Sequence, residues 1–228
     1  IGYQALQSAT ANDYNTAIGY TALYSISGSD GAEGEANTAV GYRAGYSTTT
    51  GNFNDFHGSS AGYENTTGAS NVMIGNSAGQ SNTIGSNNIY IGYQSALYQT
   101  AKGENVAIGT GGLYGANGEA SSTEASVAIG FQALSENTTA DGNTAVGMSA
   151  LFVNTTGASN TAVGAYALDA NTTASNCTAV GHNALTGNVD TTNNTAIGSN
   201  TLTINTGGSY NTALGAGSLS GNTTASYN

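Results

Sequence analysis

A glycine recurs through the whole 228-residue chain at a spacing of 17 residues, and this period constrains the fold more than any other feature. Two gaps, of 22 and 21 residues, interrupt the spacing, and the register resumes after each. The glycines in this register are Gly2, Gly19, Gly41, Gly58, Gly75, Gly92, Gly109, Gly130, Gly147, Gly164, Gly181, Gly198 and Gly215. Each occupies position 5 of the unit Asn-Thr-Ala-aliphatic-Gly-x-x-Ala-Leu-x-x-Asn-Thr-Thr-Gly-x-Ser. So short a period, repeated so often, is typical of a solenoid, in which each unit packs only against its neighbours.

The residues of the unit favour β-structure. Position 4 is aliphatic in every unit except the one with His57, and position 2 is β-branched except at Asp55. The chain contains no proline, which would remove a hydrogen-bond donor from a sheet. The sequence therefore predicts an all-β fold, a parallel β-solenoid of 17-residue coils, each coil with two short strands joined by turns. We expect positions 2 and 4 to point into the coil, and the alanines of positions 3 and 8 to leave a shallow apolar face that a neighbouring chain covers.

The repeat predicts one domain, residues 1–228, of about thirteen coils. The two longer gaps place insertions near residues 27–35 and 116–123. Because the chain starts and stops inside a unit, we expect it to be an internal stretch of a longer chain.

Two packing relations follow from comparing the units. Position 9 is usually Leu but becomes Gly45, Gly62, Gly79 and Ala96 in four consecutive units, while position 3 enlarges to Phe56, Met73 and Tyr90 over nearly the same block. Because close-packed interiors conserve volume, positions 3 and 9 are predicted to touch, within a coil, between adjacent coils or between chains. The recurring Asn of position 1 predicts a side-chain ladder, and the glycine of position 5 predicts a bend or a close approach of backbones.

The charge excludes several partners. The formal net charge is −11, and Arg43 and Lys102 are the only lysine or arginine residues. Two cations cannot neutralise a phosphate backbone, so nucleic-acid binding is not expected. No apolar run approaches the ~20 residues needed to span a bilayer, so membrane insertion is not expected either.

Catalytic and cofactor motifs are not apparent. The Ile-Gly-x-x-Ala-Leu segment also matches the hexapeptide of left-handed β-helix acyltransferases, but the other eleven residues of the unit do not comply. His57 is interpreted as a packing substitution for a core aliphatic residue, and His182 as a surface residue. Cys177 has no partner for a disulfide. We expect neither an enzyme nor a cofactor.

The first insertion supplies the one weak metal candidate, a Ca²⁺ site formed by Asp30, Glu33 and Glu35. A solvated acidic loop is the favoured explanation of these carboxylates, as it is for Glu119 and Glu124 in the second insertion. Because insertions in solenoids often emerge on the binding face, the two loops are predicted to mark a ligand surface.

Two further sets of side chains have alternative readings. Asn65, Asn137, Asn154, Asn171 and Asn222, together with Asn176 and Asn193, begin Asn-x-Ser/Thr sequons and are candidates for glycosylation. The turn that the unit requires is the favoured explanation for the recurrence of Asn at position 12, and it needs no glycosylation. Position 6 carries Tyr3, Tyr20, Tyr42, Tyr93 and Phe131, which form either a carbohydrate-stacking stripe or a partly buried aromatic ladder bridging the coils.

The Asn-Thr-Ala-Val-Gly and Ser-Val-Ala-Ile-Gly cores at residues 143–147 and 126–130 resemble the head repeats of trimeric autotransporter adhesins. They are equally similar to repeats of bacteriophage tail fibres, and the resemblance covers essentially the whole chain. It implies a left-handed parallel β-roll with three chains around one axis, located outside the cell or on a virion and serving attachment.

The expected function is therefore a rigid extracellular shaft or head of an adhesin or tail fibre, a homotrimer with a cell-surface or glycan receptor as its partner. The first alternative is a structural filament whose end coils pair with further subunits. The second is ice binding by a threonine array, which is disfavoured because the position-2 threonines are expected to be buried.

Overall fold

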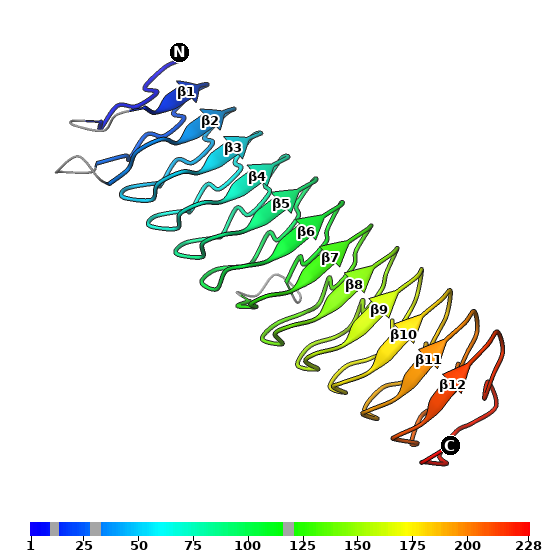
Figure 1. Ribbon diagram of the computed structural model, residues 1–228. Helices are drawn as coiled ribbons and strands as arrows, with labels where there is room; N and C mark the ends of the chain where they lie inside the picture. Colours follow the sequence, from blue (N-terminus) through cyan, green and yellow to red (C-terminus); the bar gives the residue numbers. More distant parts are fainter. Residues whose placement is uncertain (10–13, 28–32, 116–120) are drawn as a thin grey trace.

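The computed structural model describes residues 1–9, 14–27, 33–115 and 121–228. Its regular structure is one parallel sheet of twelve strands, which follow one another in chain order from β1 to β12 along a straight rod (Figure 1). Each strand is followed by a loop that returns the chain to the start of the next strand. The predicted all-β, parallel β-solenoid of 17-residue coils is confirmed.

Each strand has three residues, which are positions 2 to 4 of the unit. The strands are β1 (Thr16–Ile18), β2 (Thr38–Val40), β3 (Asp55–His57), β4 (Val72–Ile74), β5 (Ile89–Ile91), β6 (Val106–Ile108), β7 (Val127–Ile129), β8 (Thr144–Val146), β9 (Thr161–Val163), β10 (Thr178–Val180), β11 (Thr195–Ile197) and β12 (Thr212–Leu214).

The strands pair in the register that the repeat predicts. Ala145 of β8 pairs with Ala162 of β9, and the same position is paired at every step along the sheet. Thr16 pairs with Thr38 and Val106 with Val127 across the two longer gaps, so the insertions leave the sheet register intact. Equivalent residues therefore lie above one another, one coil per rung.

The predicted facing of the strands is wrong. In every strand the middle residue, position 3, is buried, while positions 2 and 4 are half-buried or exposed. Ala39 and Ala44, at positions 3 and 8, are fully buried inside the coil and form no outer face. The coil is narrow, so its interior accepts alanine from the strand where leucine occupies position 9, and a larger residue only where position 9 is small. The outer sheet face consists instead of the threonine, valine and isoleucine side chains of positions 2 and 4.

The predicted contact between positions 3 and 9 is confirmed, both within a coil and between neighbours. A Cβ added to Gly62 would overlap the Phe56 ring of its own coil, and one added to Gly45 would lie 2.6 Å from the same ring in the next coil. At Gly79 an added Cβ would lie 2.5 Å from Met73 Sδ and 2.8 Å from Tyr90 Cδ2. The enlarged side chains of three strands therefore fill the space that leucine fills elsewhere.

The predicted second strand of each coil is absent from the described residues. Positions 7 and 9 have positive φ, as at Gln132 (54°) and Leu134 (51°), so the backbone between them cannot extend. The segment still bonds to its neighbour, because Leu134 N–H donates to the Ala150 carbonyl oxygen at 3.0 Å. It is a stack of turns rather than a second sheet.

The glycine of position 5 is required by both conformation and contact, as predicted. Gly164 has a φ of +135°, and a Cβ added there would lie 2.5 Å from the carbonyl oxygen of Gly181 in the next coil. Gly164 N–H in turn donates to the Val146 carbonyl oxygen of the preceding coil at 2.7 Å. The glycines form a column in which backbones meet without side chains between them.

Two asparagine ladders satisfy the buried turn groups. In the predicted position-1 ladder, Asn54 N–H donates to Asn37 Oδ1 at 2.9 Å, and Asn54 Nδ2 donates to the Gly68 carbonyl oxygen at 2.8 Å. The sequence attributed the position-12 asparagines to the turn without predicting that they also form a ladder. There, Asn154 Nδ2 donates to Asn137 Oδ1 at 2.8 Å and to the Gly157 carbonyl oxygen at 2.9 Å.

Cys177 interrupts the position-1 ladder. Its backbone N–H donates to Asn160 Oδ1 at 2.9 Å, and its thiol donates to the Thr191 carbonyl oxygen at 3.3 Å. Burial raises the pKa of this thiol. A neutral thiol is a weaker donor and acceptor than the amide that occupies the equivalent place in most coils.

Restoring the amide with Cys177→Asn is therefore expected to stabilise the protein by about 1 kcal/mol, the net value of a typical buried hydrogen bond. Urea unfolding followed by circular dichroism measures the change. A lower midpoint for the variant would show that the cavity at this coil has adjusted to sulfur.

Candidate ligand-binding groove

The turn that follows each position-5 glycine carries positions 6, 7 and 10 of the unit. Arg43, at position 7, shows how they are arranged because its guanidinium carbon lies 5.1 Å from the ring centre of Tyr42 at position 6. The same carbon lies 5.8 Å from the ring of Tyr46 and 6.0 Å from that of Tyr63, both at position 10. Position 7 thus lies between positions 6 and 10, and we call the row that these three positions form along successive coils the axial groove.

Aromatic side chains stack along both walls in the first coils. Tyr3, Tyr20 and Tyr42 form a position-6 ladder with centroids 5.2 and 5.4 Å apart and both interplanar angles 14°. Tyr24, Tyr46 and Tyr63 form a second ladder at position 10, with centroids 5.0 and 5.2 Å apart. Position 6 is therefore an aromatic ladder here, although its rings are exposed rather than partly buried. The second ladder was not predicted from the sequence, although the recurrence of tyrosine at position 10 was a signal for it.

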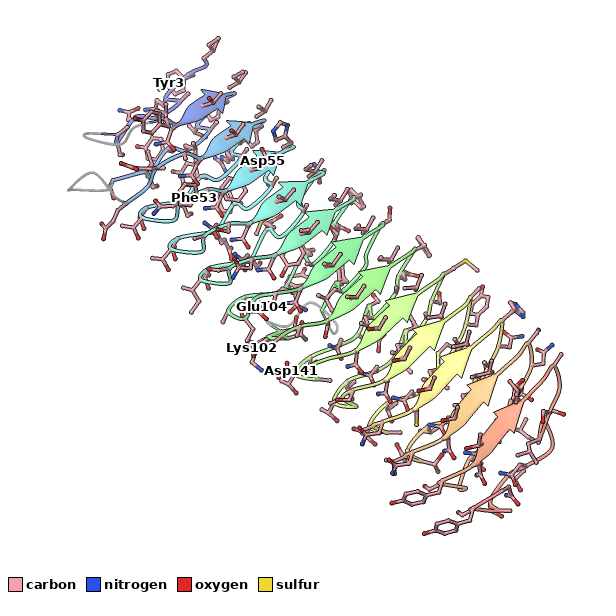
Figure 2. The ribbon with its side chains drawn as sticks, viewed as in Figure 1. Tyr3, Phe53, Asp55, Lys102, Glu104 and Asp141 are labelled. Carbon is pink, nitrogen blue, oxygen red and sulfur yellow. The ribbon has the colours of Figure 1, made fainter. Side chains whose placement is uncertain are left out.

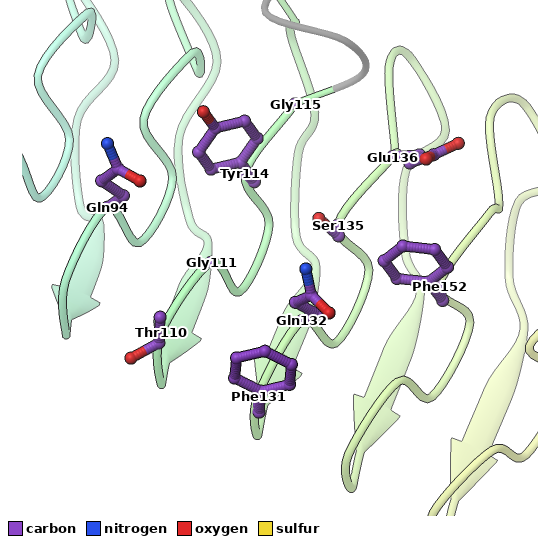
Figure 3. A pocket seen from close by; sticks show the side chains of 10 residues that line it. All are labelled: Gln94, Thr110, Gly111, Tyr114, Gly115, Phe131, Gln132, Ser135, Glu136 and Phe152. Carbon is purple, nitrogen blue, oxygen red and sulfur yellow. The ribbon is translucent and has the colours of Figure 1, made fainter.

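The axial groove contains a pocket of about 350 Å³ at the coils that follow β5 to β8 (Figure 3). Its lining residues are Gln94, Thr110, Gly111, Tyr114, Gly115, Phe131, Gln132, Ser135, Glu136 and Phe152. Aromatic rings, amides, hydroxyls and one carboxylate thus share one opening.

The pocket exists because the position-7 residue of one coil is glycine. Gly111 lies between Gln94 and Gln132, which occupy position 7 in the coils on either side. A Cβ added to Gly111 would meet only Gln132 Cγ, at 3.6 Å, which is ordinary contact. Since Gln94 and Gln132 adopt a φ of 54°, close to the 64° of Gly111, neither space nor backbone conformation requires glycine here. Its effect is to remove a side chain from the groove.

Tyr114 is held in place at one wall of this pocket. Tyr98 approaches its ring edge-on, with centroids 5.2 Å apart and an interplanar angle of 86°. Partial burial and the neighbouring Tyr98 hydroxyl raise the pKa of Tyr114. Tyr114 therefore remains an uncharged phenol and a hydrogen-bond donor at neutral pH.

The metal candidate of the first insertion is only partly visible. Asp30 lies outside the described residues, whereas Glu33 is exposed and Glu35 is half-buried. Glu35 N–H donates to Asn52 Oδ1 at 2.8 Å. Among the described residues, no three His, Cys, Asp or Glu side chains gather in a way that could hold a metal ion.

In the second insertion, Glu119 lies outside the described residues and Glu124 is exposed. Glu124 N–H donates to Asp141 Oδ1 at 2.9 Å, and Lys102 Nζ lies 2.7 Å from Asp141 Oδ2 (Figure 2). The contact with Asp141 raises the pKa of Lys102. One of the two cations is therefore already paired.

Most of the glycosylation candidates lie in the interior. Asn65, Asn137, Asn154 and Asn171 are fully buried, and their amide nitrogens donate to the carbonyl oxygens of their own turns. Asn222 makes the same bond in the last coil but is half-buried. The geometry of the buried four supports the turn interpretation, because an amide in this position is shielded from a modifying enzyme.

Two strand residues depart from the repeat, and their side chains pair with each other. His57 Nε2 lies 2.7 Å from Asp55 Oδ1, and both side chains are 43% exposed on the outer face of β3 (Figure 2). The interpretation of His57 as a core residue is therefore wrong, because position 4 points outward. His182 is exposed, as predicted, with its ring edge-on to Tyr166 at 6.1 Å.

Within the described residues, no helix has the length and apolar character needed to cross a membrane. No protein-family model, curated protein or solved structure matches the chain.

Proposed function

We propose that the protein is a rigid shaft or head segment of an extracellular attachment fibre, an adhesin or a tail fibre, in which three copies associate side by side. The observation that carries this proposal is the outer sheet face. Positions 2 and 4 of the twelve strands present threonine, valine, isoleucine and leucine, with the Asp55–His57 pair as the one charged interruption. Twelve of the thirteen acidic residues of the chain lie elsewhere.

A charge-poor strip on so acidic a molecule fits burial against further copies, since contiguous exposed apolar surface is a sign of association. Ile18, Ile108 and Ile197 are 42%, 37% and 40% exposed on this face. Side-by-side association would remove them from water. The three-fold stoichiometry comes from the resemblance to trimeric adhesin heads and tail fibres.

The proposed rigidity rests on the hydrogen bonding between coils. Strand pairs and the turn segment join successive coils, and the two asparagine ladders add bonds between many of them. A rod of this kind would hold a receptor-binding region at a fixed distance from its anchor.

The first test is the mass of the particle in solution, by sedimentation equilibrium. We expect three times the 22.5 kDa of one chain. Val163→Lys places a charge in the centre of the sheet face and is expected to give monomers, because an unpaired buried charge opposes association. Thr139→Lys, on an exposed turn, is the matched control and is expected to leave the mass unchanged. A native protein that is monomeric at all concentrations would contradict the proposal.

Ice binding is a second candidate, because the reason that disfavoured it was wrong. Position 2 faces outward, and Thr144, Thr161, Thr178, Thr195 and Thr212 occupy five successive rungs of the face. Both candidates need the same surface, so they exclude each other. A trimer without thermal hysteresis supports the fibre, whereas a monomer with thermal hysteresis supports ice binding.

Head-to-tail filaments remain the other alternative, and electron micrographs separate them from fibres. A single rod of thirteen coils at ~4.8 Å per rung is about 60 Å long. Particles many times longer than this would favour the filament.

A further inference from the structure

We propose that the pocket lined by Tyr114, Phe131 and Phe152 is a binding site for an uncharged saccharide, and that Gly111 is the residue that opens it. The inference deepens the proposed attachment function by assigning a ligand class to one site on the rod. The site lies in the axial groove and not on the sheet face.

The opening is a local departure from the repeat. Gly111 replaces the side chain that position 7 carries in the coils on either side, Gln94 and Gln132, and it lines the opening. The resulting volume of about 350 Å³ lies within the range of small-molecule sites.

Phe131 at this opening is not part of a ring stack. Tyr20 is covered on one face by Tyr3 and on the other by Tyr42. Phe131, by contrast, is 50% exposed, and position 6 is Thr110 in the preceding coil and Met148 in the next, so no ring stacks on it among the described residues. A π-face carries negative charge density, which attracts the weakly positive C–H groups of a pyranose ring.

The polar groups of the pocket suit hydroxyl groups. The side-chain amides of Gln94 and Gln132 have no hydrogen-bond partner within the described part of the chain, so both can donate and accept. The Tyr114 phenol and the Glu136 carboxylate add a donor and an acceptor. A purely apolar ligand would leave these groups unpaired, which costs affinity.

The ligand is assigned as uncharged because the pocket contains no cation. Arg43 lies between the tyrosine ladders of the first coils, and Lys102 is paired with Asp141. An acidic sugar or a phosphate would meet Glu136 and a chain of net charge −11 without any compensating group.

Saturation-transfer NMR on the native protein tests the assignment with lactose, maltose, cellobiose and chitobiose as probes, and 3′-sialyllactose as the acidic counterpart. We expect transfer from the aromatic protons to at least one uncharged probe. Gly111→Gln restores the side chain found in the coils on either side and is expected to weaken this binding at least tenfold, without lowering the midpoint of thermal unfolding.

Gly217→Gln is the matched control, since Gly217 is also a position-7 glycine with a positive φ of 67°, and a Cβ added there meets nothing within 4 Å. It lies far along the rod from the pocket and should leave binding unchanged. The assignment is overturned if no uncharged probe receives saturation, if binding survives Gly111→Gln, or if 3′-sialyllactose binds more tightly than lactose. The number of chains per particle, which tests the fibre proposal, does not depend on any of these results. Either proposal can therefore fail without the other.

Discussion

Gly164→Ala is expected to divide the single unfolding transition of the rod into two. The added Cβ would lie 2.5 Å from the Gly181 carbonyl oxygen, and the φ of +135° is itself strained for alanine. The two coils cannot move apart without breaking the bond that Gly181 N–H donates to the Val163 carbonyl oxygen at 2.8 Å. We therefore expect the free energy of unfolding to fall by about 4 kcal/mol or more, a size that is typical of severe backbone or core defects.

The defect should divide the molecule because coils contact only their neighbours. Stability in such arrays is a sum of unit and nearest-neighbour terms, so one failed interface uncouples the two flanking segments. Urea titration by circular dichroism is expected to show two steps with smaller denaturant dependence than the native single step.

Gly215→Ala separates the two causes of the loss. Gly215 occupies the same repeat position with a φ of +110°, but a Cβ added there meets nothing within 4 Å. Gly215→Ala should therefore lower the free energy of unfolding only by the cost of the strained backbone conformation, about 1–3 kcal/mol. Equal losses at Gly164 and Gly215 would show that the close approach of backbones is not what selects glycine.

The exchange of volume between positions 3 and 9 leads to the second large effect. Phe56→Ala is expected to destabilise by about 3–5 kcal/mol through the cavity it leaves. Gly62→Leu is expected to destabilise because its side chain would overlap the Phe56 ring. The double variant recreates the Ala–Leu pair of the common unit, for instance Ala162 with Leu168, and should recover most of both losses.

The backbone permits this rescue, since Gly62 has a φ of 58° and Leu168 one of 53°. Stabilities of the native protein, the two single variants and the double variant form a thermodynamic cycle that measures the coupling. Additive losses in the double variant would contradict the contact. A small residual loss is expected, because Phe56 also fills the space above Gly45.

The repeat predicted the register, the asparagine ladder and the glycine column, but not which face of the strand is the interior. Alternation separates position 3 from positions 2 and 4, yet both faces are apolar, so hydrophobicity does not distinguish them. Side-chain size does distinguish them, because a coil with leucine at position 9 has room for Ala145 rather than Val146 in its interior. The exchange between Phe56 and Gly62 predicted that positions 3 and 9 touch, but it left open whether they do so inside the coil or between chains.

The turn segment lacked a comparable signal. Leu134 and Leu151 have φ of 51° and 52°, a conformation that leucine seldom adopts, so propensity argued for an extended strand. Stacking and buried leucine side chains impose this backbone, and neither is visible in a single unit.

No groove was predicted from the sequence, which indicated only the aromatic residues of position 6. The tyrosines of position 10 lie beside them, and the pocket follows from one glycine, Gly111, that departs from the unit. Comparing each unit with the consensus reveals this departure. Its effect on the surface is visible only when four successive coils are placed side by side.

The in-register column of backbones has a consequence for how such a molecule changes length. Duplication or deletion of one 17-residue segment recreates the interface it interrupts, because the new neighbours present the same glycine and asparagine pattern. The length of the rod can therefore increase or decrease in steps of ~4.8 Å while the packing of the interior stays the same.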